Sequence, residues 1–125
     1  MTSEFTVDQA RATLAELRPA IDELIRLRAD AAELAAAVQE ESASVLGGLP
    51  ELKAAQARLD ELLARIVRAG LEIKGIAPLL LDFPATLDGV PVLLCWLEGE
   101  PELAWYHRLD LGFLGRRPLD RTSDS

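Results

Sequence analysis

Apolar residues recur every three or four positions over the first 70 residues and every second position after that. Near the start, Thr6 followed by Gln9 forms a capping box, and Phe5 occupies the position of a hydrophobic staple. We therefore expect a helix to begin at residue 7. Its apolar face has the spacing of a packed helix and comprises Leu14, Leu17, Ile21, Leu24, Ala31, Ala35 and Val38.

Pro19 interrupts this helical pattern. A proline inside a helix removes one backbone hydrogen bond and costs roughly 3 kcal/mol. Arg18, the residue before it, is a poor N-cap for a new helix. We therefore expect one helix with a kink at the proline.

Glycine and proline end the first helical pattern and start a second. Gly47 and Gly48, followed by Pro50, predict that the first helix ends near Val45 and that the second begins at Pro50. Gly70 is a natural terminator of the second helix. Residues 6–70 should thus form a long antiparallel helical hairpin that packs like a coiled coil.

Beyond residue 70, alternating apolar residues and turn residues predict strands. Residues 71–74 form a short strand, and residues 79–87 and 90–97 flank Asp88-Gly89, a strong hairpin signal. A two-residue turn there makes one face apolar and places Asp82 opposite Cys95 on the other. The apolar pairs are Leu87 with Val90, Ala85 with Val92, Phe83 with Leu94, and Leu81 with Trp96.

Two features limit this sheet. Pro84 lies within a strand, which predicts an edge position or a bulge there. A last strand covers residues 102–107 with its register left open, and residues 121–125 should be a frayed tail.

The whole chain is therefore predicted to be a single α+β domain. The helical hairpin is followed by a three- to four-stranded antiparallel sheet within residues 71–120.

Composition and charge exclude several classes of protein. Half of the residues are hydrophobic, and Cys95 is the only cysteine, so neither a disordered chain nor a disulfide-stapled fold is expected. The net charge of −8 disfavours nonspecific binding to nucleic acid or to anionic membranes. The start lacks the pattern of a signal peptide, and the longest apolar run is too short to span a membrane. We expect a cytoplasmic protein that binds neither nucleic acid nor membrane.

The chain resembles the bacterial domain-of-unknown-function family 2203 at motifs that span nearly all of it, apart from residues 29–49. These motifs are Phe5-Thr6, Leu17-Arg18-Pro19, Leu71-Glu72-Ile73-Lys74, Asp82-Phe83-Pro84, Asp88-Gly89, Leu94-Cys95-Trp96, Gly99-Glu100, Tyr106-His107 and Gly112-Phe113-x-Gly115-Arg116. The resemblance supports the boundaries of the fold. It implies no activity, cofactor or site residue.

His107 and Asp82 are the first candidates for a binding site. His107 is the only histidine, and no metal-binding spacing such as HExxH or CxxC occurs, so we predict no metal, cofactor or catalytic residue. A histidine–carboxylate metal site with Asp82, Glu98, Glu100 or Glu102 is the alternative to a structural, hydrogen-bonded histidine. Asp82 is unexpected between apolar strand residues, and Lys74, Arg116 or Arg117 are possible partners for it.

A loop over residues 112–117 is the second candidate. It contains two glycines followed by Arg116 and Arg117, a composition that suits an anion, although internal pairing with acidic residues is the simpler interpretation. We expect Arg116 to pair with a carboxylate such as Asp82. Cys95 alternates with apolar strand residues and should be a buried, inert thiol.

The pattern favours an interaction protein over an enzyme. Part of the hairpin extends beyond the reach of the sheet, and its apolar residues Leu34, Val38, Leu63 and Val67 would need a further surface. We therefore expect a homodimer formed through the hairpins, or a helical protein partner in the same place. The alternative function is a small-molecule or anion-binding domain, or a weak hydrolase, with its site at Asp82, His107 and Arg116.

Overall fold

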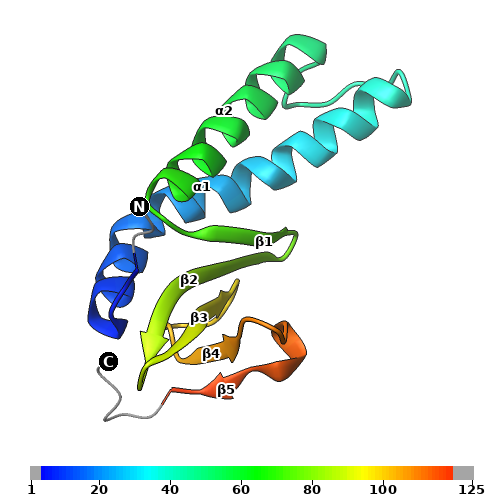
Figure 1. Ribbon diagram of the computed structural model, residues 1–125. Coiled ribbons are helices and arrows are strands. Elements are labelled where there is room, and N and C mark those ends of the chain that lie inside the picture. The colour runs from blue at the N-terminus through cyan, green and yellow to red at the C-terminus, as the bar shows by residue number, and fades with distance from the viewer. Residues whose placement is uncertain (1–3, 120–125) are drawn as a thin grey trace. The chain divides into compact units, whose positions relative to one another are not determined.

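The α+β architecture predicted from the sequence is confirmed. A computed structural model describes residues 4–119. Two helices, α1 (Val7–Gln39) and α2 (Leu49–Arg68), precede five antiparallel strands. The strands are β1 (Glu72–Ile76), β2 (Leu79–Leu87), β3 (Val90–Leu97), β4 (Trp105–Arg108) and β5 (Arg117–Pro118), with a short 3₁₀ turn η1 (Phe113–Gly115) before the last (Figure 1).

The chain divides into two compact units. Leu17–Arg65 form one unit, which contains most of the helical hairpin. Met1–Glu16 together with Ile66–Ser125 form the other, which contains the first turns of α1 and the whole sheet. No helix within residues 4–119 is both long and apolar enough to cross a membrane.

Helix α1 begins where the capping box places it. The Thr6 hydroxyl accepts a hydrogen bond from the Gln9 amide at 3.1 Å, and the Gln9 side chain accepts one from the Thr6 amide at 3.0 Å. These two bonds satisfy amides that a helix N-terminus otherwise leaves unpaired. The helix then continues through Pro19 without a break.

The end of α1 differs from its prediction. The helix stops at Gln39, six residues before Val45. The Ser42 amide donates to the Ala37 carbonyl and the Glu41 amide to the Val38 carbonyl, while Glu41 has a φ of 53°. This is a Schellman motif, in which the left-handed residue is a glutamate. The prediction was wrong because it required glycine at this position.

The interior of the hairpin accounts for two of the four predicted interface residues. Leu34, 3% exposed, belongs to a buried cluster with Ala31, Leu52 and Ala55, and Val38 packs against that cluster. Leu34 therefore needs no further surface, whereas Val38 is only half-buried. Of the other two predicted interface residues, Leu63 is half-buried and Val67 is 55% exposed.

The central hairpin of the sheet has the predicted register. Leu87 is opposite Val90 and Asp82 is opposite Cys95, and the apolar pairs between them follow as expected. Asp88 and Gly89 form the turn with φ values of 50° and 79°, the two positive values that a type I′ turn requires. Because side chains alternate between faces, Asp82 points away from the face on which Phe83 makes an edge contact with Phe5.

Pro84 lies in the part of β2 that extends beyond its pairing with β1. Strand β2 is an inner strand, but its pairing with β1 ends at Asp82, so Pro84 is on a local edge. There the Phe5 amide donates to the Pro84 carbonyl at 2.8 Å. The edge predicted from the proline is therefore present at that position of the strand.

The C-terminal part has one strand more than the predicted maximum of four. Strand β4 begins at Trp105 instead of residue 102 and pairs His107 with Leu93. The short β5 then pairs Tyr106 with Arg117. A two-residue strand carries no alternation that a sequence pattern can reveal. The predicted tail at residues 121–125 lies outside the described residues.

Candidate functional site

A pocket of about 260 Å³ lies on the sheet face that carries Asp82. Strands β1 to β4 supply its floor, and the segment after β4 supplies one wall. We call it the Asp82 pocket, and it is lined by Lys74, Leu80, Asp82, Leu93, His107, Leu109, Asp110, Leu111, Gly112 and Phe113.

The register of three adjacent strands brings three reactive side chains together beside this pocket. Asp82 on β2 is directly opposite Cys95 on β3, and His107 on β4 is opposite Leu93, two residues from Cys95. Residues two apart in a strand share a face, so all three side chains point the same way. One potential ligand atom from each lies within 4.8 Å of those from the other two.

His107 and Asp82 form a buried pair. The Nε2 atom of His107 lies 3.1 Å from Oδ2 of Asp82, and the side chains are 6% and 1% exposed. The Nδ1 atom lies 2.9 Å from the Arg108 carbonyl oxygen, which can only accept. The Nδ1 atom must therefore carry a proton, and the contact between Nε2 and Oδ2 needs a second, shared proton.

The second carboxylate oxygen of Asp82 is unpaired. Burial raises the pKa of the Asp82 carboxyl, and the nearby His107, a hydrogen bond from the Cys95 thiol and the charge of Lys74 oppose this effect. Oδ1 is buried and has no hydrogen-bond partner among the described residues. An unpaired buried acceptor is uncommon and costly, which makes this oxygen the most informative atom of the pocket.

Cys95 is buried, as predicted. Burial raises the pKa of its thiol to about 12, and the negative charge of Asp82 acts in the same direction. The thiol is therefore protonated at neutral pH and is a poor nucleophile on its own.

Arg116 does not join this group. Its Nη2 atom lies 2.8 and 2.7 Å from the two carboxylate oxygens of Glu100. The predicted pairing of Arg116 with a carboxylate is therefore confirmed, but the partner is Glu100 instead of Asp82. The guanidinium also stacks on the rings of Trp105 and Phe113, at 4.8 and 4.7 Å from their centroids. Arg116 thereby holds η1, which contributes Phe113 to the pocket wall, against the sheet.

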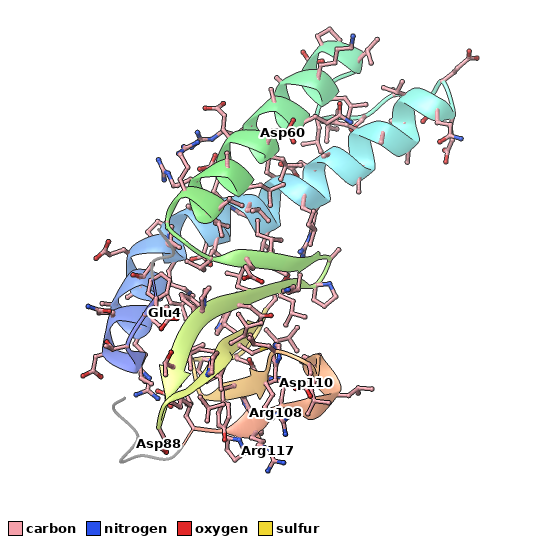
Figure 2. The ribbon with its side chains drawn as sticks, viewed as in Figure 1. Glu4, Asp60, Asp88, Arg108, Asp110 and Arg117 are labelled. Carbon is pink, nitrogen blue, oxygen red and sulfur yellow. The ribbon has the colours of Figure 1, made fainter. Side chains whose placement is uncertain are left out.

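Arg117 lies at a different pocket. This second cavity, of about 290 Å³, is lined by Asp88 of the β2–β3 turn, Tyr106, Arg108 and Arg117. Asp88, Arg108 and Arg117 are labelled in Figure 2. The Arg108 guanidinium pairs with Asp110 at 3.2 Å. The predicted anion loop is thus divided: one arginine is bound to Glu100, and the other lines a separate pocket.

Sequence reasoning missed the apolar wall of the Asp82 pocket. Leu109, Leu111 and Phe113 alternate beyond the end of β4, where no partner strand exists for them. Exposed apolar residues in a glycine-containing loop were the available signal. Lys74, considered as a partner of Asp82, lines the pocket and forms its ion pair with Glu72 at 2.9 Å, while its charge also lowers the pKa of Asp82.

Comparison with known proteins identifies the family. Neither curated proteins nor solved structures include a match to this chain. The sequence model of a family described as "Uncharacterized conserved protein (DUF2203)" matches residues 3–119, which is nearly the whole chain and agrees with the resemblance seen in its motifs. The protein therefore belongs to the DUF2203 family.

Proposed function

We propose that the chain binds a small molecule in the Asp82 pocket. The supporting observation is the buried Oδ1 atom of Asp82, which has no partner among residues 4–119 and belongs to a residue of the pocket lining. A ligand that donates a hydrogen bond to this oxygen recovers free energy that the fold by itself leaves unused.

The lining of the pocket restricts the class of ligand. The volume of about 260 Å³ is below the roughly 300–1,000 Å³ of pockets that hold drug-sized molecules, so the ligand is small. Apolar side chains form half of the lining, whereas Lys74 and Asp110 add opposite charges. These features favour a compact molecule with an apolar portion and a hydrogen-bond donor, such as an amine, amide or alcohol.

Glycine offers a direct way to block this pocket. Gly112 is a lining residue, and a Cβ atom added to it would meet nothing within 4 Å. A Gly112→Trp variant can therefore fold, and its ring adds bulk among the lining residues of the pocket. Gly48, in the connection between the helices, has equally open surroundings, so Gly48→Trp is the matched control.

The experiment is a fragment screen by NMR on the ¹⁵N-labelled full chain after treatment with EDTA. We expect small apolar amines, amides or alcohols to shift the amide signals of Leu93, His107 and residues 109–113. Gly112→Trp should weaken this binding at least tenfold, and Gly48→Trp should leave it unchanged. The proposal is overturned if no fragment shifts these signals, or if Gly112→Trp binds as the unmodified chain does.

Self-association through the hairpin remains a prediction. It now depends on Val38, Leu63 and Val67, because Leu34 is buried inside the hairpin. Light scattering at micromolar concentration measures it directly. A mass near the monomer value of 13.6 kDa would contradict it.

A further inference from the structure

We propose that Asp82, Cys95 and His107 form a binding site for a divalent transition-metal ion, with Zn²⁺ as the best fit. The inference rests on the proposed function, because the ion would lie at the floor of the same pocket. Carboxylate oxygen, thiolate sulfur and imidazole nitrogen are the three kinds of atom that bind zinc in proteins.

The distances suit one ion. The Oδ2 and Nε2 atoms are 3.1 Å apart, and the three potential ligand atoms all lie within 4.8 Å of one another. Ligands of a tetrahedral zinc ion are separated by about 3.3–3.7 Å, given metal–ligand bonds of about 2.0–2.3 Å. Small rotations of the side chains therefore bring the three atoms to coordination distance, with no change in the strand register.

The orientation of His107 is that of a metal ligand. Its Nδ1 atom donates to the Arg108 carbonyl, which leaves Nε2 as the nitrogen that faces Asp82 and Cys95. Histidine ligands usually donate their other ring N–H to a carboxylate, a carbonyl or water, and this contact sets the tautomer. The strand backbone thus already supplies the outer hydrogen bond that a metal site needs.

The charges balance for a divalent ion. A carboxylate and a thiolate carry two negative charges, the imidazole is neutral, and a buried site is most stable when its total charge is zero. On binding, the ion replaces the thiol proton of Cys95 and the proton shared by Asp82 and His107, and both protons pass to the solvent. A monovalent cation would leave one negative charge buried.

One coordination position of the metal ion would remain open toward the Asp82 pocket. Asp82 and His107 line the pocket, whereas Cys95 is buried beside them. Three protein ligands with a fourth position open to a cavity are typical of zinc sites that bind a water or a substrate. A small molecule in the Asp82 pocket would then contact the ion directly.

Cobalt provides the test, because Co²⁺ replaces Zn²⁺ and absorbs light. We expect the EDTA-treated full chain to bind one Co²⁺ ion and to show the visible bands of a tetrahedral site, together with a near-ultraviolet charge-transfer band from the thiolate. Zn²⁺ should displace the cobalt and remove both signals. Cys95→Ser should abolish the charge-transfer band, and His107→Gln should weaken metal binding by about 100-fold or more.

Asp60→Asn is the matched control, because Asp60 is an exposed carboxylate on α2 that neither lines the pocket nor belongs to the three ligands. It should bind Co²⁺ as the unmodified chain does. Circular dichroism verifies that each variant is folded, and Cys95→Ala replaces Cys95→Ser if the latter is not. The inference is overturned if no charge-transfer band forms, or if a folded Cys95 variant shows the same spectrum.

The two proposals fail separately. Fragments that bind the EDTA-treated chain without any cobalt signal would support the small-molecule pocket and overturn the metal site. A cobalt signal that depends on Cys95 and His107, without any fragment binding, would support the metal site and overturn the proposed function.

Discussion

The imidazole of His107 reaches across β3 to the carboxylate of Asp82, so that residues from two strands that are not neighbours meet at 3.1 Å. Both side chains are buried, and the strand between them adds the thiol of Cys95. The polar side of the sheet is therefore organised around one pair of residues. Substitution of this pair provides the first prediction.

Asp82→Ala should lower the free energy of unfolding by about 1–3 kcal/mol, because it leaves Nε2 of His107 buried without a partner. The double variant Asp82→Leu/His107→Leu removes both polar groups and should be more stable than the sum of the two single leucine variants predicts. Urea denaturation measures all of them. Strictly additive losses would contradict the pairing.

Arg116→Lys should destabilise the chain by about 1–2 kcal/mol. Lysine keeps the charge but loses both ring stacks of the planar guanidinium, in a side chain that is 11% exposed. Arg117→Lys is the control, since Arg117 is exposed and should change the stability by less than about 0.5 kcal/mol. Equal losses in the two variants would show that the contacts of Arg116 contribute nothing.

Trp96→Ala should cost on the order of 3–5 kcal/mol, because Trp96 is 1% exposed and its ring N–H donates to the Glu100 carbonyl at 3.0 Å. Leu114→Ala is the control, as the Leu114 side chain is fully exposed at 100%. Thermal unfolding of both variants gives the comparison. A loss below about 1 kcal/mol for Trp96→Ala would mean that this face of the sheet is not part of the core.

The Cys95 thiol should resist alkylation in the folded, metal-free chain. Its pKa of about 12 leaves almost no thiolate at pH 8, and burial excludes the reagent. Iodoacetamide should modify it far more slowly than in the same chain unfolded in urea, as mass spectrometry can follow. Equal rates would show that the thiol is accessible.

The stability of the helical hairpin should depend on pH through Glu23. A hydrogen bond from Arg58, at 2.7 Å, lowers the pKa of Glu23 from its ordinary value of 4.5. The ion pair therefore stabilises the folded state above pH 4.5, and this contribution is lost as the pH falls through the lower, folded-state value. NMR titration of the Glu23 carboxyl should show the lowered pKa, and Arg58→Gln should restore it. An ordinary pKa in the unmodified chain would contradict the pair.

Short-range signals determined much of the fold from the sequence alone. The reciprocal bonds of Thr6 and Gln9 involve residues three apart, and the Asp88-Gly89 turn sets the register of the strands on either side of it. From that register, the placement of Asp82 opposite Cys95 followed directly. Such features are predictable because neighbouring residues satisfy them without the rest of the chain.

Tertiary structure decided the rest. The connection between β3 and β4 contains seven residues, so no turn geometry sets their register, and the pairing of His107 with Leu93 depends on packing. The choice of Glu100 over Asp82 as the partner of Arg116 likewise depends on where the η1 loop folds back. A charge pattern indicates which residues could pair, but the distances between segments far apart in the sequence determine which pair forms. Here Arg116, paired with Glu100, stacks on Phe113, a lining residue of the Asp82 pocket.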